Sequence, residues 1–424
     1  MKALKELLRI HDFRLLWTGQ VVSNFGDALT SLALLLTAEH LTGSVAAVAA
    51  TAIAIALPQL FFGLIAGVYV DRWNRKYVMV VSDIVRGVLV LGFLLVTTPG
   101  HMWLLYVVAF AQATIGTLFT PARMAILPEI IPEEHLLSAN SIAQSSRVIF
   151  NLLGTAAAGL IAGLTGSIAP TFIVDSGTFL VSAMLVSRVA AGPAPQRADR
   201  SSSPSMWSEL TVGLRVLADS SVLKGVLIGG GIVMFGLGAV NVLLVPFVVG
   251  VLEVPATWFG ALEASQVTSM VLSGALLVVL AAKFRPTNLI SAGLAGTGLV
   301  VASMALAGTV WHLMLALFAV GWFVTPLQAS IATLLQSEVE AEKRGRAGSA
   351  LNTAMTGAQV ASMALAGASA AAIGVRGVFV ASGAIALLAG LVTVRLFRDV
   401  PLAAMGEVEI GHSGTLSGQE EAQW

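Results

Sequence analysis

Long stretches without a charged side chain are the feature of this 424-residue sequence that most constrains its fold. A helix that crosses the hydrocarbon core of a bilayer needs about 20 consecutive, mostly apolar residues. The longest stretch has room for two such helices joined by a tight turn near Gly308 and Thr309. The sequence therefore predicts an all-α integral membrane protein. The charge-free stretches are 41–70, 87–122, 148–174, 225–252, 264–282, 286–337, 347–375 and 377–394.

Composition agrees with this prediction, because 57% of the residues are hydrophobic, 11% are charged and the mean hydropathy is +0.89. Soluble globular chains carry about 25% charged residues, which excludes a soluble enzyme, a basic nucleic-acid-binding protein and a disordered chain. The absence of Cys excludes disulfides and thiolate metal sites. The His residues form no metal-binding pattern and no phosphate-binding loop is present, so we expect no metal, no cofactor and no use of ATP.

Splitting the apolar stretches at Gly, Pro and polar residues gives about twelve spanning segments, although ten or eleven are also possible. Proline recurs at corresponding places, as Pro121 in the fourth segment and Pro326 in the tenth, and each is followed by an Asn, Asn140 or Asn352. This echo predicts two six-helix pseudo-repeats around a central site, an arrangement of many secondary transporters. The segments lie near 14–39, 45–70, 78–97, 102–127, 140–164, 168–189, 223–250, 256–282, 287–307, 311–336, 347–372 and 376–396.

The predicted domains are a six-helix bundle over 1–190, a linker over 191–221, a second bundle over 222–398 and a disordered tail over 399–424. The first part of the linker is rich in Pro, Ser and Arg, which is typical of a flexible connection. Its second part predicts an amphipathic helix that lies on the cytoplasmic face of the membrane. The apolar residues of that helix recur at helical spacing and are Trp207, Leu210, Leu214 and Leu217.

Lys and Arg are distributed unequally between the two sides of the predicted bundle. If the N-terminus is cytoplasmic, the outer loops hold only Arg376. This asymmetry predicts a multi-pass protein of the bacterial cytoplasmic membrane with both termini in the cytoplasm. A cleaved signal peptide is the alternative for the first apolar run, but that run is long, contains Asn24 and Asp27, and lacks a small-residue cleavage site. The expected cytoplasmic cations include Arg72, Arg75, Lys76, Arg188, Arg215, Lys224, Lys283, Arg285, Lys343, Arg344, Arg346 and Arg395.

The loop between the second and third segments reads GVYVDRWNRK and has a distinctive spacing of charges. Gly67 lets a neighbouring helix approach closely, and Asp71 ends the apolar run. Arg72, Arg75 and Lys76 then form a compact cluster of cations. An ordinary positive-inside loop is the alternative interpretation, but the Gly and Asp spacing favours a more specific role.

This loop, in a chain of this length with a 6+6 layout, resembles the signature loop of the major facilitator superfamily. Further segments narrow the resemblance to the drug:proton antiporter branch that contains macrolide-efflux proteins and the enterobactin exporter. They are FRLLWTGQ over 13–20, SNFGD over 23–27, TPARMAILPE over 120–129 and LLSAN over 136–140. The resemblance covers the whole layout, while its specific motifs lie in the first half.

The resemblance implies transport by alternating access, with a gate at the cytoplasmic side. It implies that Asp71 faces the positive N-terminal end of the helix that starts near Ala347. It also implies that Arg75 pairs with Glu129 or a neighbouring acid, and that the third-segment residues Asp83 and Arg86 join this network. The gating residues expected from it are Gly67, Asp71, Arg72, Arg75, Lys76, Asp83, Arg86 and Glu129.

The fifth segment departs from the pattern of the superfamily. Exporters often carry a Gly-Pro-x-x-Gly-Gly element there, whereas this chain reads GTAAAG over 154–159. The Pro and one Gly are absent. The small residues Gly154, Gly159 and Gly163 still allow close packing between helices.

Energy coupling is expected to depend on the few acids within the predicted spans. A charged side chain at the bilayer centre costs about 2.5–3.5 kcal/mol on insertion scales, so such a group is paired, protonated or in contact with water. Asp27, near the middle of the first segment, is the first candidate for a proton site, and Glu263 in the eighth is the second. The alternative for Asp27 is a structural hydrogen bond to another helix. Asp175 is interpreted as a structural acid near the membrane interface.

The substrate cavity is expected between the first, fourth, seventh and tenth segments. Arg123 and Arg147 are candidates for binding an anionic group, although a place in the gate or at the membrane surface is the favoured interpretation. For the aromatic candidates, packing between helices or against lipid is the alternative. The candidate cavity residues are Phe25, Phe119, Arg123, Phe235, Asn241, Trp322, Phe323 and Gln328.

We therefore predict a secondary active transporter, not an enzyme, that exports amphipathic small molecules such as drugs, macrolide-like compounds or siderophores in exchange for protons. A lysophospholipid translocator of the same fold is the second hypothesis, and a membrane sensor without transport is the third. An intramembrane enzyme would need a catalytic dyad at matched depth, and none stands out. The expected partners are the substrate, protons and membrane lipids, without nucleic acid, and the protein is expected to be a monomer.

Overall fold

The computed structural model describes residues 2–70, 73–190 and 206–397, and every regular element in these ranges is a helix. The first half contains α1 (Lys2–Arg9), α2 (His11–Thr42), α3 (Val45–Val70), α4 (Arg75–Leu91), α5 (Met102–Ile130), α6 (Leu136–Thr165) and α7 (Ala169–Ser187). The second half contains α8 (Met206–Asp219), α9 (Ser221–Val245), α10 (Phe259–Lys283), α11 (Pro286–Met304), α12 (Val310–Glu338) and α13 (Ala341–Leu396). Short helical turns are η1 (Gly92–Leu95), η2 (Pro99–His101), η3 (Glu133–His135), η4 (Pro246–Val251) and η5 (Ala256–Trp258).

Ten of the described helical segments are long and apolar enough to cross a membrane. One of them, Glu342–Arg395, consists of two helices, because the backbone of α13 is not helical at Gly374. The 25 residues of α10 also reach across a hydrocarbon core of about 30 Å. When α10 is included and the two parts of α13 are counted separately, these helices account for the spans expected from the sequence, and the predicted all-α membrane fold is confirmed.

Side-chain caps mark the starts of several helices. Thr309 accepts a hydrogen bond from the backbone N–H of His312 at 3.4 Å, which starts α12 at the predicted turn after α11. Asn74 caps α4 in the same way by accepting the N–H of Tyr77 at 3.3 Å. Such caps satisfy N–H groups that have no partner within the helix.

Gly374 joins the last two spans and adopts φ 73° and ψ 163°, a region of backbone conformation that is essentially restricted to Gly. We expect Gly374→Ala to lower the free energy of unfolding by about 1–3 kcal/mol, because a Cβ is strained there. Gly345→Ala is the matched control, since its backbone is helical and a Cβ would meet no atom within 4 Å. Thermal unfolding of the purified variants measures the difference, and equal midpoints would contradict the prediction.

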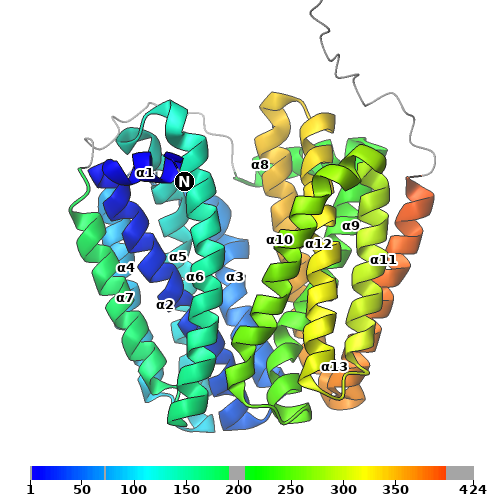
Figure 1. Cartoon of the computed structure of the whole chain (residues 1–424), viewed down its shortest axis with the longest axis horizontal. Coiled ribbons are helices and arrows are strands. Elements are labelled where there is room, and N and C mark those ends of the chain that lie inside the picture. Colours follow the sequence, from blue (N-terminus) through cyan, green and yellow to red (C-terminus); the bar gives the residue numbers. More distant parts are fainter. Residues whose placement is uncertain (1, 71–72, 191–205, 398–424) are drawn as a thin grey trace, which may run out of the picture.

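Figure 1 shows the helices up to α7 on one side of the molecule and α8 to α13 on the other. In the first group, α2 packs against α6 and α7, and α4 packs against α5 and α7. In the second group, α13 packs against α9 and α11, and α12 packs against α10 and α11. The two groups meet mainly through α3 with α13 and α6 with α10. The linker residues 191–205 and the tail 399–424 lie outside the described residues, so the predicted domain bounds stay predictions.

The two groups touch closely at the end of the bundle away from the N-terminus. A Cβ on Gly159 would lie 2.4 Å from the carbonyl oxygen of Ala256, and one on Gly163 would lie 2.3 Å from a methyl carbon of Thr257. A Cβ on Gly260 would also overlap α6. We call the contacts of these three glycines the glycine seam. Larger residues at these positions would force the two groups apart.

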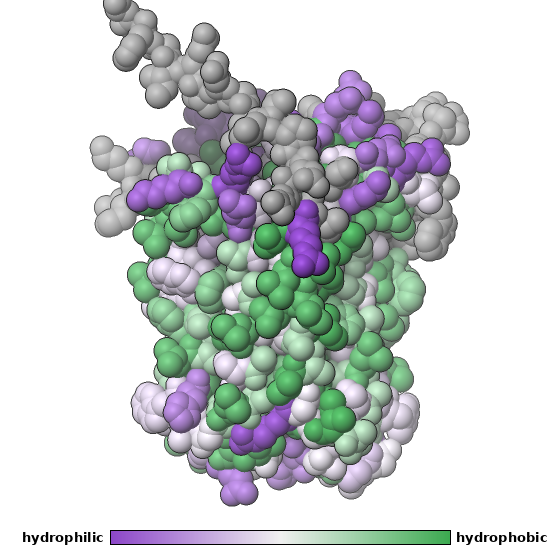
Figure 2. Space-filling model, turned by 90° about the vertical axis from the view of Figure 1, so that its right-hand side faces the viewer, coloured by the Kyte–Doolittle hydropathy of each residue, from purple (hydrophilic) through white to green (hydrophobic). Residues whose placement is uncertain are grey.

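An apolar core extends from the glycine seam into both groups. It contains Leu29, Leu32 and Leu36 of α2 together with Leu243 of α9 and Phe247 of η4. On the outside, Figure 2 shows hydrophobic residues across the middle of the visible face and hydrophilic residues gathered at its two ends. This belt is what a bilayer-spanning surface requires, because only its ends meet water.

The amphipathic helix predicted in the second part of the linker forms α8. Leu217 is fully buried in the core of the second group, and Leu210 and Leu214 pack against that core. At Gly213 the helix approaches α13 so closely that a Cβ would lie 2.4 Å from the carbonyl oxygen of Arg346. The apolar face of α8 therefore packs on protein.

Candidate functional site

Four charged residues lie together where α2, α4 and α7 meet. Asp27 of α2 forms an ion pair with Arg86 of α4, which donates a hydrogen bond to its Oδ1 atom. Asp83 lies one helical turn before Arg86, and Asp175 belongs to α7. Both of these acids are within electrostatic range of Asp27 and Arg86. We call Asp27, Asp83, Arg86 and Asp175 the acid cluster.

The guanidinium of Arg86 is held by contacts with three other helices. Its central carbon lies 4.3 Å from the ring centroid of Phe179 on α7, a favourable cation–π arrangement. A Cβ on Gly116 of α5 would lie 3.5 Å from the same carbon. The side chain of Arg86 is only 11% exposed, whereas that of Asp27 is 34% exposed. Asp27 is therefore the more exposed partner of this ion pair.

The other two carboxyl groups of the acid cluster are fully buried. Thr30 of α2 donates a hydrogen bond to Oδ2 of Asp175, and Thr178 donates one to Oδ1 at 3.1 Å. The carboxyl group of Asp83 lies beside the hydroxyl of Ser182 on α7. The cluster therefore holds three carboxyl groups and a single guanidinium in one small volume, a composition suited to a site that binds and releases protons.

Small residues let α2, α4 and α7 come close enough to form the acid cluster. A Cβ on Gly26 would lie 2.0 Å from Oγ1 of Thr178 and 2.2 Å from Oδ1 of Asp175. Ser176 of α7 donates a hydrogen bond to the carbonyl oxygen of Gly87 on α4 at 2.8 Å. The positions of the three acids thus depend on close contacts between helix backbones.

The acid cluster differs in part from the prediction made from the sequence. Asp27 is surrounded by other helices, but Asp83 and Arg86 lie with it rather than with the gate residues near the start of α4. The reason is their distance along α4, since Arg86 comes eleven residues, or about 16 Å, after the first residue Arg75. Asp175 is fully buried and accepts a hydrogen bond from Thr30 of α2, as a structural acid would, while its depth in the membrane stays a prediction.

The predicted gate is described only in part. Arg75, the first residue of α4, forms an ion pair with Glu129 near the end of α5. Both helices belong to the first group, so this pair braces one group and does not bridge the two. Gly67 lies within α3 and Lys76 in the first turn of α4, whereas Asp71 and Arg72 lie outside the described residues.

The ion pair of Arg75 and Glu129 is expected to add about 1 kcal/mol to stability, because its side chains are 22% and 31% exposed and solvent screens them. Arg75→Glu and Glu129→Arg should each lower the unfolding midpoint. The doubly exchanged variant should recover most of the loss, since opposite charges again face each other. Denaturation of the three variants measures this coupling, and additive losses in the double variant would contradict it.

Glu263, the second candidate for a proton site, lies in the second turn of α10 and therefore in the second group of helices. The structure does not bring it to the acid cluster. In the described ranges, no group of three His, Asp or Glu side chains is placed to hold a metal ion.

The candidate cavity residues divide into packed and exposed ones. Phe25 and Phe119 pack against apolar cores, and a Cβ on Gly296 would lie 2.5 Å from the ring of Phe323. These rings pack between helices, and their contact with a substrate stays a prediction. Polar residues that are exposed in a spanning helix can instead border water. Asn241 and Gln328 are exposed, and Phe235, Trp322 and Arg123 are half-buried.

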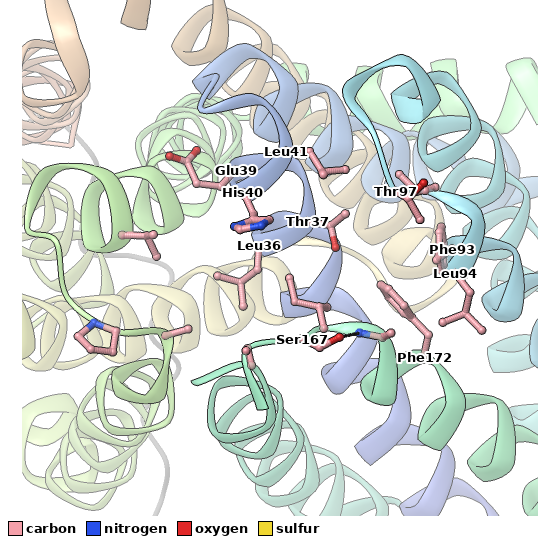
Figure 3. Close-up of a pocket in the computed structure, with 18 of the residues that line it drawn as sticks. Leu36, Thr37, Glu39, His40, Leu41, Phe93, Leu94, Thr97, Ser167 and Phe172 are labelled. Carbon is pink, nitrogen blue, oxygen red and sulfur yellow. Dashed lines mark hydrogen bonds between the residues drawn. The ribbon is translucent and has the colours of Figure 1, made fainter. Parts of the chain in front are cut away.

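Two cavities lie between the groups of helices. One of about 540 Å³ lies near the glycine seam and is lined by Glu39 and His40 at the end of α2, with Phe172 across from them (Figure 3). The other, of about 270 Å³, lies between Gln59 of α3 and Asn352 of α13. None of the candidate cavity residues lines either of them. In the sequence, the two cavities are marked only by single polar residues within apolar helices.

Several proteins resemble this chain over most of its length. The uncharacterised MFS-type transporter YfiS of Bacillus subtilis is 28% identical over 390 residues, which cover 89% of this chain and 91% of that protein. Macrolide efflux protein A of Streptococcus pyogenes is 26% identical over 392 residues, which cover 90% of this chain and 94% of that protein. The putative bacilysin exporter BacE of Bacillus subtilis is 31% identical over a shorter match, 40% of this chain and 42% of that protein.

Solved transporter structures have the same fold. A variant of the nucleoside transporter NupG superposes with a TM-score of 0.72 at 14% identity, covering 91% of this chain and 100% of that one. An inward-facing bacterial homologue of the human lysosomal transporter Spinster superposes with a TM-score of 0.71 at 14% identity, covering 91% and 96%. Residues 6–414 match the family described as transmembrane secretion effector. The chain therefore belongs to the transmembrane secretion effector family and is a multi-pass transporter of the major facilitator superfamily.

Proposed function

We propose that the protein is a secondary active exporter that moves amphipathic small molecules out across the bacterial cytoplasmic membrane in exchange for protons. The observation that carries this proposal is the acid cluster, in which Asp27 and Arg86 pair among membrane-spanning helices beside two further carboxyl groups. The family places the chain among transporters. One relative is called a macrolide efflux protein and another a putative bacilysin exporter, which supports the direction.

Protonation of Asp27 is the step that couples export of the small molecule to entry of a proton. It removes the negative charge that holds Arg86, whose remaining acidic neighbours are Asp83 on α4 and Asp175 on α7. When the guanidinium turns to them, the ion pair between α2 and α4 is lost. Because a different set of helices is then held together, binding of a proton changes the packing of the first group.

Access to the site alternates as the two groups separate at one end and approach at the other. In this proposal the glycine seam lies outside the cell and both termini lie in the cytoplasm, an orientation that the distribution of Lys and Arg supports. The groups touch at the seam while Asp27 is 34% exposed, which fits a conformation that opens to the cytoplasm. Export then requires the glycine seam to open.

The test uses the full chain in liposomes whose lumen is more acidic than the bath. Molecules inserted with their cytoplasmic side outward should concentrate ethidium, a macrolide or an anionic amphipathic dye in the lumen above the level of protein-free liposomes, and a protonophore should abolish this difference. Movement of a fluorescent lysophospholipid without dependence on the pH gradient would favour the lipid-translocator hypothesis. If none of these compounds moves, transport of amphipathic molecules is refuted.

A further inference from the structure

A row of polar side chains follows α6 through the membrane-spanning region. Asn140, Gln144, Arg147 and Asn151 recur every three or four residues, so they share one face of the helix, and all four are exposed. Polar groups exposed to hydrocarbon are costly, and such residues normally face a water-filled space. We call these four residues the polar stripe. It borders a path that water can enter.

The backbone of Arg147 lies within the part of α6 that is expected to cross the hydrocarbon core. The 30 residues of α6 extend about 45 Å, whereas the hydrocarbon core is about 30 Å thick. Even if the whole excess of about 15 Å projected beyond the core at the start of α6, Arg147 would lie deeper, about 17 Å from Leu136. Its exposed guanidinium shares one helix face with Gln144 and Asn151, and a polar face of this kind borders water or an anion inside the bundle.

A second arginine lies close to the polar stripe. Arg123 of α5 is near enough to Arg147 for their positive charges to repel each other. In the part of the chain that the structure describes, neither forms an ion pair. The single acid of α5, Glu129, is held by Arg75. Two guanidinium groups that lie within electrostatic range of each other and have no paired acid both attract an anion, and both can donate hydrogen bonds to it.

We infer that Arg123 and Arg147 bind the anionic group, a carboxylate, sulfonate or phosphate, of the amphipathic molecules that the protein exports. This inference rests on the proposed function and narrows its substrate class. The site is confined to the first group of helices. If Asn140 is aligned with Asn352 in the second half, the residue that corresponds to Arg147 is the uncharged Gln359.

The test compares two dyes that share their aromatic rings, anilinonaphthalene sulfonate and phenylnaphthylamine, of which only the first carries a negative charge. Binding is measured by fluorescence with the full chain in phosphatidylcholine nanodiscs. Arg123→Gln and Arg147→Gln should each raise the Kd of the sulfonate dye about tenfold and leave the Kd of the neutral dye unchanged. Arg147→Lys should retain most of the affinity, because it keeps the charge.

Arg285→Gln is the matched control, since Arg285 is an exposed cation at the start of α11, away from the polar stripe. It should change the binding of neither dye. Unchanged binding of the sulfonate dye in the double variant Arg123→Gln/Arg147→Gln would overturn the inference. Equal losses for both dyes would also overturn it, because they would indicate a structural role.

Two further comparisons distinguish a substrate site from a lipid-headgroup site and test the anion site separately from the proposed function. Nanodiscs with phosphatidylglycerol test whether a lipid headgroup occupies the arginines, and loss of the arginine-dependent dye binding there would refute the assignment to substrate. Arginine-dependent binding that persists in these discs supports it. If the sulfonate dye binds through the arginines but neither dye is moved in liposomes with an acidic lumen, the proposed function fails while the anion site stands.

Discussion

Asp27→Asn is expected to abolish proton-driven accumulation of substrate while downhill exchange continues. The amide keeps the size of the side chain but neither binds nor releases a proton in this range of pH, so the ion pair with Arg86 no longer responds to protons. In liposomes with an acidic lumen, accumulation should fall to the level of liposomes without protein. Exchange of labelled for unlabelled substrate, which needs no net proton movement, should persist in the same preparation.

Asp12→Asn is the matched control for this experiment. Asp12 lies in the first turn of the same helix, far from the acid cluster, and 27% of its side chain is exposed. It should leave accumulation at the wild-type level. Full accumulation by Asp27→Asn would show that the coupling proton binds elsewhere, and Glu263 of α10 would then be the residue to replace.

Gly26→Ala is expected to lower the stability of the folded protein by about 2–3 kcal/mol, near the upper end of what overpacking costs. The added Cβ would lie 2.0 Å from Oγ1 of Thr178 and 2.2 Å from Oδ1 of Asp175, so α2 and α7 must move apart. The same movement disturbs the hydrogen bond from Thr30 to Asp175. The thermal unfolding midpoint of purified protein measures the loss.

Gly177→Ala provides the comparison, because Gly177 lies on α7 beside Thr178 but a Cβ there would meet no atom within 4 Å. Its unfolding midpoint should equal that of the wild type. An unchanged midpoint for Gly26→Ala would mean that α2 and α7 do not approach as closely as the structure indicates. The liposome assay on Gly26→Ala adds a second readout, since displacement of Asp175 should also weaken the dependence of transport on pH.

The positions of the spanning helices follow from the sequence because hydrocarbon selects for apolar length. The predicted segment 45–70 coincides with α3, and the turn before α12 lies where Gly308 and Thr309 predict it. The first turn of α6 was harder to predict. It begins at Leu136, four residues before the predicted start, because a turn outside the hydrocarbon leaves no hydropathy signal.

The acid cluster was predictable only in part. Asp27 stands out because a carboxylate within an apolar helix is costly and therefore rare. Its partner Arg86 is 59 residues away in the sequence, and Thr30 and Asp175 are 145 residues apart. Helical periodicity defines the faces of one helix but not which helices are neighbours. The pairing therefore becomes visible only when α2, α4 and α7 are packed together.

In the proposed transport cycle, the glycine seam determines what the closing of one end of the protein costs in conformational entropy. Long side chains such as Lys, Arg or Met lose about 1.5–2 kcal/mol of rotamer freedom when they become ordered, whereas Gly and Ala lose none. Gly159 contacts the backbone of Ala256, and Gly260 contacts Ala156. Each closure at these contacts therefore freezes almost no rotamers. In the proposed transport cycle, the open and closed ends are therefore nearly balanced in this respect, and the proton and the substrate decide which of them is populated.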